Sequence, residues 1–139
     1  MSATPSFSVE RIFDFTGQVA VIIGGTSGLG KAIALGFARA GADVIASSRS
    51  QAAGEEVASE VADTGRRTLA LVSDVTDRQS LQMLHDCILA SFKTIHILVY
   101  AAGITRRTPT LDCSKISGTA LWIPTSMGRF VPVRFSAGP

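Results

Sequence analysis

Short apolar runs alternate with longer segments of helical period along the first hundred residues of the chain. The apolar runs are rich in β-branched residues, and each is followed by a segment in which apolar side chains recur every three or four positions. Four strands are predicted, at Val19–Ile23, Asp43–Ser47, Thr68–Val72 and Ile95–Val99. Three helices are predicted between them, at about Leu29–Ala40, Ala52–Thr64 and Asp77–Phe92. This alternation is typical of a parallel sheet with helices on both faces.

Apolar positions within the helical segments support this architecture. Val57 and Val61 are spaced to form the inner face of the second helix, and Leu81, Leu84 and Ile88 form one stripe on the third. Right-handed crossovers place the strands in the order 3-2-1-4, numbered along the chain. The predicted fold class is α/β, the first half of a Rossmann-type doubly wound parallel sheet, with the C-terminal half missing. A ligand is expected where the strand order reverses, at the carboxyl ends of the first and fourth strands.

The alternation of strands and helices stops near Thr110. Beyond that point Gly and Pro interrupt the chain repeatedly, and no further strand and helix unit can be drawn. We therefore expect three parts: an N-terminal extension at 1–16, a half-domain at 17–113 and an irregular tail at 114–139.

A glycine-rich run separates the first predicted strand from the first predicted helix. Glycine tolerates positive φ, and the lack of a Cβ lets backbone N–H groups approach phosphate oxygens closely. With the helix dipole behind them, these N–H groups form an anion site suited to a pyrophosphate. The candidate residues of this turn are Gly24, Thr26, Ser27, Gly28, Leu29 and Gly30.

The second predicted strand is followed by Ser48, Arg49 and Ser50. An NAD site usually carries an acidic residue here, about twenty residues beyond the glycines, to bind the ribose hydroxyls. A guanidinium flanked by hydroxyls suits a 2′-phosphate instead, because its planar fork pairs with phosphate oxygens. NADP is therefore the expected cofactor and NAD the less favoured one, which makes 17–113 an NAD(P)-binding unit. The alternative is that Arg49 is a solvated loop residue.

Two further segments follow predicted strands at the same edge of the sheet. Asp74 and Val75 come after the third strand, where a carboxylate can accept from an adenine amino group while its neighbour lines the ring pocket. The alternative, compatible with the first, is that Asp74 caps a turn before the next helix. After the fourth strand come the candidate cofactor-binding residues Tyr100, Ala101, Ala102 and Gly103.

Charge and composition narrow the classes of partner. The formal net charge is +2 over 139 residues with the basic residues scattered, so neither nucleic acid nor a membrane surface is an expected partner. The N-terminal sixteen residues lack the apolar core of a signal peptide, which leads us to expect a cytoplasmic protein. Cys87 and Cys113 lack metal-ligand spacing and are expected to be reduced thiols. The expected partner is a small-molecule cofactor.

Three motifs, in order, resemble those of the short-chain dehydrogenase/reductase family. That family carries T-G-x-x-x-G-x-G after its first strand, D-V after its third and an N-A-G type turn after its fourth. The corresponding segments here are Ile23–Gly30, Asp74–Val75 and Tyr100–Gly103, and the resemblance covers about Phe15 to Cys113. It implies an oxidoreductase that moves hydride between NADP(H) and a small alcohol or carbonyl substrate, in a protein whose full-length relatives form oligomers.

One segment of the chain indicates a subgroup of the family, and two residues differ from the family's motifs. The opening segment 13–20 is most similar to the sugar-acid, polyol and 3-oxoacyl reductases of the family. Ile23 and Tyr100 replace the family's Thr and Asn, so a polar link across the floor of the cofactor site is expected to be missing. Tyr100 is also expected to place an aromatic ring where the nicotinamide half approaches.

The family's catalytic residues have no counterpart in these 139 residues. They are a serine that holds the carbonyl and a tyrosine that acts as acid and base, followed four residues later by a lysine. The single tyrosine here is Tyr100, and Ile104 stands four residues on. The resemblance therefore implies no catalytic site in this chain, which we expect to be inactive. The alternative is a non-catalytic, truncated nucleotide-binding fragment or the product of a pseudogene.

The tail at 114–139 is interpreted as a frameshift. Permitted codons for Ser114 to Ala137, read one base displaced, give a sequence that resembles the family's next helix, and Met127 followed by Gly128 forces its N-x-x-G glycine. The alternative is a genuine variant with a C-terminus of its own.

Overall fold

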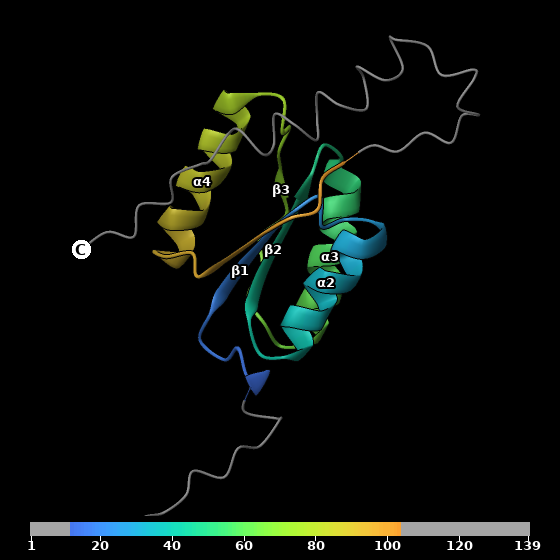
Figure 1. The fold of residues 1–139 in the computed structure, drawn as a ribbon, viewed down its shortest axis with the longest axis vertical. Coiled ribbons are helices and arrows are strands. Elements are labelled where there is room, and N and C mark those ends of the chain that lie inside the picture. The colour runs from blue at the N-terminus through green and yellow to red at the C-terminus, as the bar shows by residue number, and fades with distance from the viewer. Residues whose placement is uncertain (1–11, 104–139) are drawn as a thin grey trace, which may run out of the picture.

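Four parallel strands form the sheet of the computed structural model, which describes residues 12–103 (Figure 1). The strands are β1 (Val19–Ile23), β2 (Asp43–Ser48), β3 (Leu71–Val72) and β4 (Ile97–Tyr100). The helices are α2 (Gly28–Arg39), α3 (Gln51–Asp63) and α4 (Arg78–Phe92). The sheet order is β3-β2-β1-β4, so the predicted fold class and strand order are confirmed.

The sheet lies between two helical layers, with α2 and α3 on one face and α4 on the other (Figure 1). Alternate residues of β1 point to opposite faces of the sheet and pack against the two helical layers. Ala20 and Ile22 join the cluster under α2 and α3, whereas Val19, Val21 and Ile23 join the cluster under α4. All five are buried, which explains why β1 is an unbroken apolar run rather than an alternating one.

The predicted helix faces are the ones that the structure buries. Val57 and Val61 of α3 pack into one cluster, and Leu81, Leu84 and Ile88 of α4 pack into the other. Burial of each such side chain stabilises the fold by about 2 kcal/mol. Each helix also begins and ends within one residue of its predicted bounds.

The third strand is shorter than predicted. A strand was expected over Thr68–Val72, but only Leu71–Val72 joins the ladder with β2. Before it, the N–H of Arg67 donates to the Asp43 carboxylate and the Arg67 carbonyl accepts from the N–H of Val44. These bonds hold the chain near β2 without strand geometry, so the predicted strand of five residues is wrong in length.

The fourth strand is displaced along the chain relative to the predicted Ile95–Val99. The Nδ1 atom of His96 accepts from the N–H of Val19 at 3.0 Å, so a ring nitrogen takes the place of a backbone carbonyl at the start of this ladder. The regular strand therefore begins at Ile97 and runs on through Tyr100. Tyr100 is the last residue of β4 rather than the first residue of a turn.

Several predictions from the sequence lie outside the described residues. They are the frameshift and the irregular tail at 114–139, most of the N-terminal extension at 1–16, and the state of Cys113. Cys87 is a free, exposed thiol. None of the helices within residues 12–103 has both the length and the hydropathy needed to cross a bilayer.

Candidate functional site

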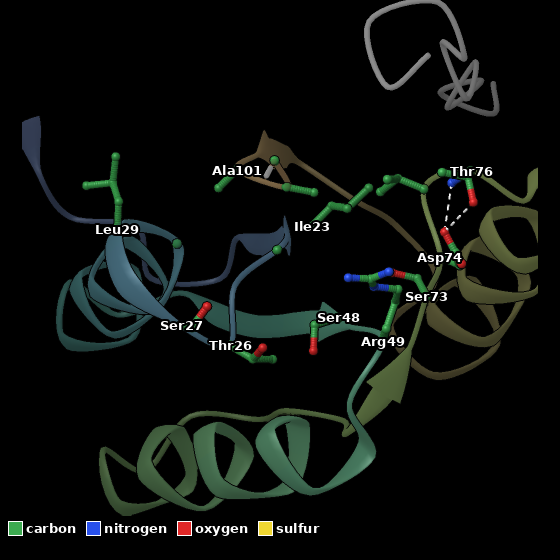
Figure 2. A pocket seen from close by; sticks show the side chains of 15 residues that line it. Ile23, Thr26, Ser27, Leu29, Ser48, Arg49, Ser73, Asp74, Thr76 and Ala101 are labelled. Carbon is green, nitrogen blue, oxygen red and sulfur yellow. Dashed lines mark hydrogen bonds between the residues drawn. The ribbon is translucent and has the colours of Figure 1, made fainter. Parts of the chain in front are cut away.

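A cavity of about 320 Å³ opens at the edge of the sheet where β1, β2, β3 and β4 all end (Figure 2). This volume lies within the usual range for small-molecule sites. Most of the predicted site residues line it. These are Gly24, Thr26, Ser27, Leu29, Gly30, Ser48, Arg49, Asp74, Val75, Ala101, Ala102 and Gly103. The cavity lies at the expected reversal of strand order, between β1 and β4.

Three predicted site residues do not line the cavity. Ser50 is the N-cap of α3, where its hydroxyl accepts from the N–H of Ala53 at 3.3 Å. Gly28 opens α2 with φ of +52°. Tyr100 packs instead against the cluster under α4, and its partial burial raises the pKa of its hydroxyl. The ring of Tyr100 is therefore not among the side chains that line this cavity, and its place beside the nicotinamide half stays a prediction.

The alternation of side chains along β4 explains the position of Tyr100. Its pairing partner in β1 is Ile23, and the two strand ends are joined by a backbone hydrogen bond of 2.8 Å from Ala101 to the Ile23 carbonyl. Successive residues of a strand point to opposite faces. Val99 and Ala101 therefore pack on the α2 and α3 side, which directs Tyr100 toward α4.

Three glycines of the turn are required by close packing, and a Cβ on one of them, Gly25, would lie 2.8 Å from the Ile22 carbonyl oxygen. Gly24 has φ of +80°, and a Cβ there would lie 2.5 Å from the nitrogen of Ala102. A Cβ on Gly30 would collide with the carbonyl oxygen of Gly24. Because each of these contacts is with a backbone atom, none can be relieved by a rotamer change. The narrow approach between the turn, α2 and the end of β4 exists only with glycine at positions 24 and 30.

The backbone amides of the turn divide into two groups. Those of Gly24 and Gly25 donate to the Ser47 carbonyl, at 2.8 and 3.2 Å, and so are used within the protein. At the start of α2, by contrast, the side chain of Ser27 makes no capping bond and no acidic residue occupies the first turn. Helix N–H groups without a capping side chain carry the positive end of the helix dipole, so the first turn of α2 is suited to bind an anion.

The opposite end of the cavity brings an arginine and a carboxylate together. Arg49 is exposed just beyond β2, and within residues 12–103 its guanidinium forms no ion pair. Figure 2 shows Arg49, Ser73 and Asp74 close together at this end, with Ser27 and Leu29 at the other. An exposed, unpaired guanidinium is able to bind an anion without first giving up a partner.

Asp74 has a local partner of its own. Its carboxylate accepts from the hydroxyl and the backbone N–H of Thr76, at 2.7 and 2.9 Å (Figure 2). These two bonds, with a smaller contribution from the charge of Arg49, lower the pKa of Asp74. The turn-capping alternative is thus confirmed, while the helix itself is capped by Asp77, whose carboxylate accepts from Gln79.

Ile23, which the sequence analysis placed at the floor of the cofactor site, lines the cavity, as do Ser73 and Thr76, which the sequence analysis did not select. Ser73 is buried, and its hydroxyl lies 2.8 Å from that of buried Ser47. Serines at the ends of two adjacent apolar strands are the signal that would have identified this pair. Thr76 follows Asp74 by two residues, the spacing of a turn closed by an aspartate side chain.

Comparison with known proteins identifies the family. The family model for short chain dehydrogenases matches residues 18–120. The chain belongs to the short chain dehydrogenase family. Members of this family use a nicotinamide dinucleotide, NAD(H) or NADP(H). The tight glycine turn and the uncapped start of α2 fit the pyrophosphate of such a cofactor.

Curated relatives support the finer resemblance as well. A 2-dehydro-3-deoxy-D-gluconate 5-dehydrogenase from Pseudoalteromonas atlantica is 40% identical over 111 residues, which are 79% of this chain and 42% of the relative. A D-threitol dehydrogenase from Mycolicibacterium smegmatis is 32% identical over 114 residues, which are 82% of this chain and 44% of the relative. A 3-oxoacyl-(acyl-carrier-protein) reductase from Haemophilus influenzae is 39% identical over 90 residues, which are 65% of this chain and 36% of the relative. The resemblance to sugar-acid, polyol and 3-oxoacyl enzymes is thereby confirmed.

A solved structure has the same fold. The short-chain type dehydrogenase/reductase from Mycobacterium marinum superposes with a TM-score of 0.81 at 32% sequence identity, covering 88% of this chain and 48% of that one. The present chain therefore spans about half the length of that solved chain. It spans about two fifths of the length of the 2-dehydro-3-deoxy-D-gluconate 5-dehydrogenase and the D-threitol dehydrogenase.

Proposed function

We propose that the cavity binds NADP(H) in preference to NAD(H), as the cofactor site of an oxidoreductase that acts on a small alcohol or carbonyl compound. The first turn of α2 would hold the pyrophosphate, and Arg49 with Ser48 would hold the 2′-phosphate. Asp74 and Val75 would bind the adenine, and the segment 101–103 would lie along the nicotinamide half. When bound, the nicotinamide ring accepts or releases the hydride.

The exposed guanidinium of Arg49 is the observation that carries the preference for NADP(H). In NAD sites an acidic side chain at this position binds the ribose 2′-hydroxyl, and a carboxylate there would repel a 2′-phosphate. Here the end of β2 carries Ser48, Arg49 and Ser50 and no acidic residue. The carboxylate that lines the cavity, that of Asp74, already accepts two hydrogen bonds from Thr76.

We propose further that these 139 residues bind the cofactor without catalysing hydride transfer on their own. A general acid must reach the reacting atoms, and the single tyrosine of the sequence, Tyr100, packs under α4 outside the cavity. The sequence holds no Y-x-x-x-K. Beside the first candidate function, the cofactor site of an oxidoreductase, the second candidate function is therefore nucleotide binding without catalysis.

Fluorescence titration of the purified chain with NADPH and NADH tests the cofactor proposal. We expect NADPH to bind more tightly, and Arg49→Ala to weaken NADPH about tenfold or more while leaving NADH unchanged, because one charge-assisted contact contributes about 1.5–3 kcal/mol. Arg39→Ala is the matched control, since Arg39 is exposed at the far end of α2. Tighter binding of NADH would contradict the role of Arg49, and the absence of saturation at millimolar NADPH would contradict the site itself.

Absorbance at the NADPH band tests the second part of the proposal. We expect no oxidation of NADPH by the purified chain when small aldehydes, ketones or keto sugars are added. Oxidation that depends on the carbonyl compound would show that the chain supplies its own acid and base, and would overturn the proposal that it only binds.

A further inference from the structure

Ser47 is a fully buried polar residue near the end of β2 that does not line the cavity. Its polar atoms nevertheless contact two of the segments that do. The carbonyl oxygen accepts from the N–H groups of Gly24 and Gly25, and the hydroxyl oxygen lies 2.8 Å from that of Ser73. These contacts follow from the sheet order, because β2 lies between β1, which leads into the glycine turn, and β3, which leads into Ser73.

The hydrogen bond between the Ser47 and Ser73 hydroxyls helps to hold the segment after β3 against β2, because the pairing between these two strands is short. Only two residue pairs join β2 to β3, and Val72 is 43% exposed. Beyond the ladder, the segment that carries Asp74 is tied to β2 by two bonds. One runs from the N–H of Ser73 to the Ser48 carbonyl at 2.9 Å, and the other joins the Ser47 and Ser73 hydroxyls.

Both hydroxyls are sealed from solvent. Ser47 is 0% exposed and Ser73 is 2% exposed, and within residues 12–103 neither hydroxyl makes a second hydrogen bond. When the Ser73 hydroxyl is removed, the Ser47 hydroxyl, which does not line the cavity, cannot turn to water without opening the end of the sheet. A buried hydroxyl left without its partner destabilises the arrangement that contains it.

We propose that Ser47 is a positioning residue for the bound cofactor, acting through Ser73 and through the glycine turn. Its hydroxyl sets the spacing between Arg49, two residues along β2, and Asp74, which follows Ser73. Its carbonyl sets the orientation of the turn at Gly24 and Gly25. This inference rests on the proposed function, because the spacing matters only if a 2′-phosphate and an adenine bind at Arg49 and Asp74.

The test compares Ser47→Ala, Ser73→Ala and the double variant. Titration with adenosine 2′,5′-bisphosphate and with NADPH gives the dissociation constants, and NADH gives the preference ratio. We expect each single variant to bind the bisphosphate about tenfold more weakly and to lose most of its preference for NADPH over NADH. Because the two hydroxyls act as one unit, the double variant should be no weaker than the single variants.

Two controls separate positioning from general destabilisation. Ser59→Ala makes the same chemical change on the exposed face of α3 and should alter neither stability nor binding. Thr64→Ala removes a hydroxyl that donates to the Val61 carbonyl at 2.6 Å, away from the cavity, and should lower the melting temperature while leaving the preference ratio unchanged.

Each of the other possible outcomes either supports or overturns the positioning role of Ser47. An unchanged preference ratio in a folded Ser47→Ala variant, or losses that multiply in the double variant, would overturn the inference while leaving the cofactor site intact. If Ser47→Ala does not fold, Ser73→Ala removes the same bond from the other side and gives the answer. A wild-type chain that binds neither the bisphosphate nor NADPH would overturn the proposed function and this inference together.

Discussion

Gly24 lies against the backbone of Ala102, so closely that a Cβ on Gly24 would be 2.5 Å from the Ala102 nitrogen. The contact joins the end of β1 to the segment after β4, across the point where the strand order reverses. The glycine therefore allows the two strand ends to meet as well as allowing the turn. A cavity at this place depends on both properties.

Gly24→Ala should lower the free energy of unfolding by about 3 kcal/mol, because it adds strain at positive φ to a clash with backbone atoms. Gly36→Ala is the matched control, since Gly36 lies in α2 and a Cβ there would meet nothing within 4 Å. That change should stabilise the chain by about 0.5–1 kcal/mol. Urea unfolding measures both, and equal effects of the two substitutions would contradict the packing at Ala102.

The regular parts of the fold were predictable because they depend on local patterns. Five successive apolar residues in β1 require burial on both faces of a sheet, and the stripe of Leu81, Leu84 and Ile88 fixes the buried side of α4. The glycine turn follows from the same reasoning, since a strand, a run of glycines and a helix leave few alternatives.

The parts that were missed depend on partners distant in sequence. Neither Ser47 nor Ser73 shows its role alone, because each hydroxyl is satisfied by the other across 26 residues of sequence. The position of Tyr100 depends on how far β4 extends along β1, since side chains alternate between the two faces of a strand. The length of β3 depends on where Arg67 meets Asp43 and Val44, which no periodicity reveals.

The helix N-termini offer a second prediction, in which two serines at equivalent positions behave differently. Ser50→Ala should cost about 1 kcal/mol, because its hydroxyl accepts from Ala53 at the start of α3. Ser27→Ala should leave the stability of the ligand-free chain unchanged, because the Ser27 side chain caps nothing at the start of α2. Thermal unfolding distinguishes the two, and a comparable loss in both variants would show that α2 has a side-chain cap.

The two faces of α4 give a third prediction. Ile88 is 1% exposed within the cluster under α4, so Ile88→Ala should cost about 2–5 kcal/mol through lost burial and the cavity it leaves. Met83 is 61% exposed on the same helix, and Met83→Ala should change stability by less than about 0.5 kcal/mol. Chemical denaturation of both variants checks the orientation of the helix, which would be contradicted if Met83→Ala were the more damaging change.

The bonds between Asp74 and Thr76 predict a dependence of stability on pH. They lower the pKa of Asp74 in the folded chain, so the stability that they provide is fully present above the pKa of the unfolded chain, about 3.9. It is lost as the pH falls through the lower, folded value. Asp74→Asn should therefore reduce stability most near neutral pH, and the difference from wild type should shrink as the solution is acidified below about pH 4.

Thr76→Val is the companion variant for the same measurement, because it removes the hydroxyl donor at 2.7 Å and keeps the backbone donor at 2.9 Å. With one of its two bonds removed, the pKa of Asp74 should rise part of the way to its usual value. The acid-dependent loss of stability should then begin at the same pH as in wild type, which the pKa of the unfolded chain sets, but should be complete at a higher pH and be smaller in total. Urea midpoints recorded across the acid range test this order. Identical pH profiles for wild type and Asp74→Asn would show that the carboxylate contributes nothing through Thr76, and would leave the full hydrogen-bonding capacity of Asp74 to the adenine.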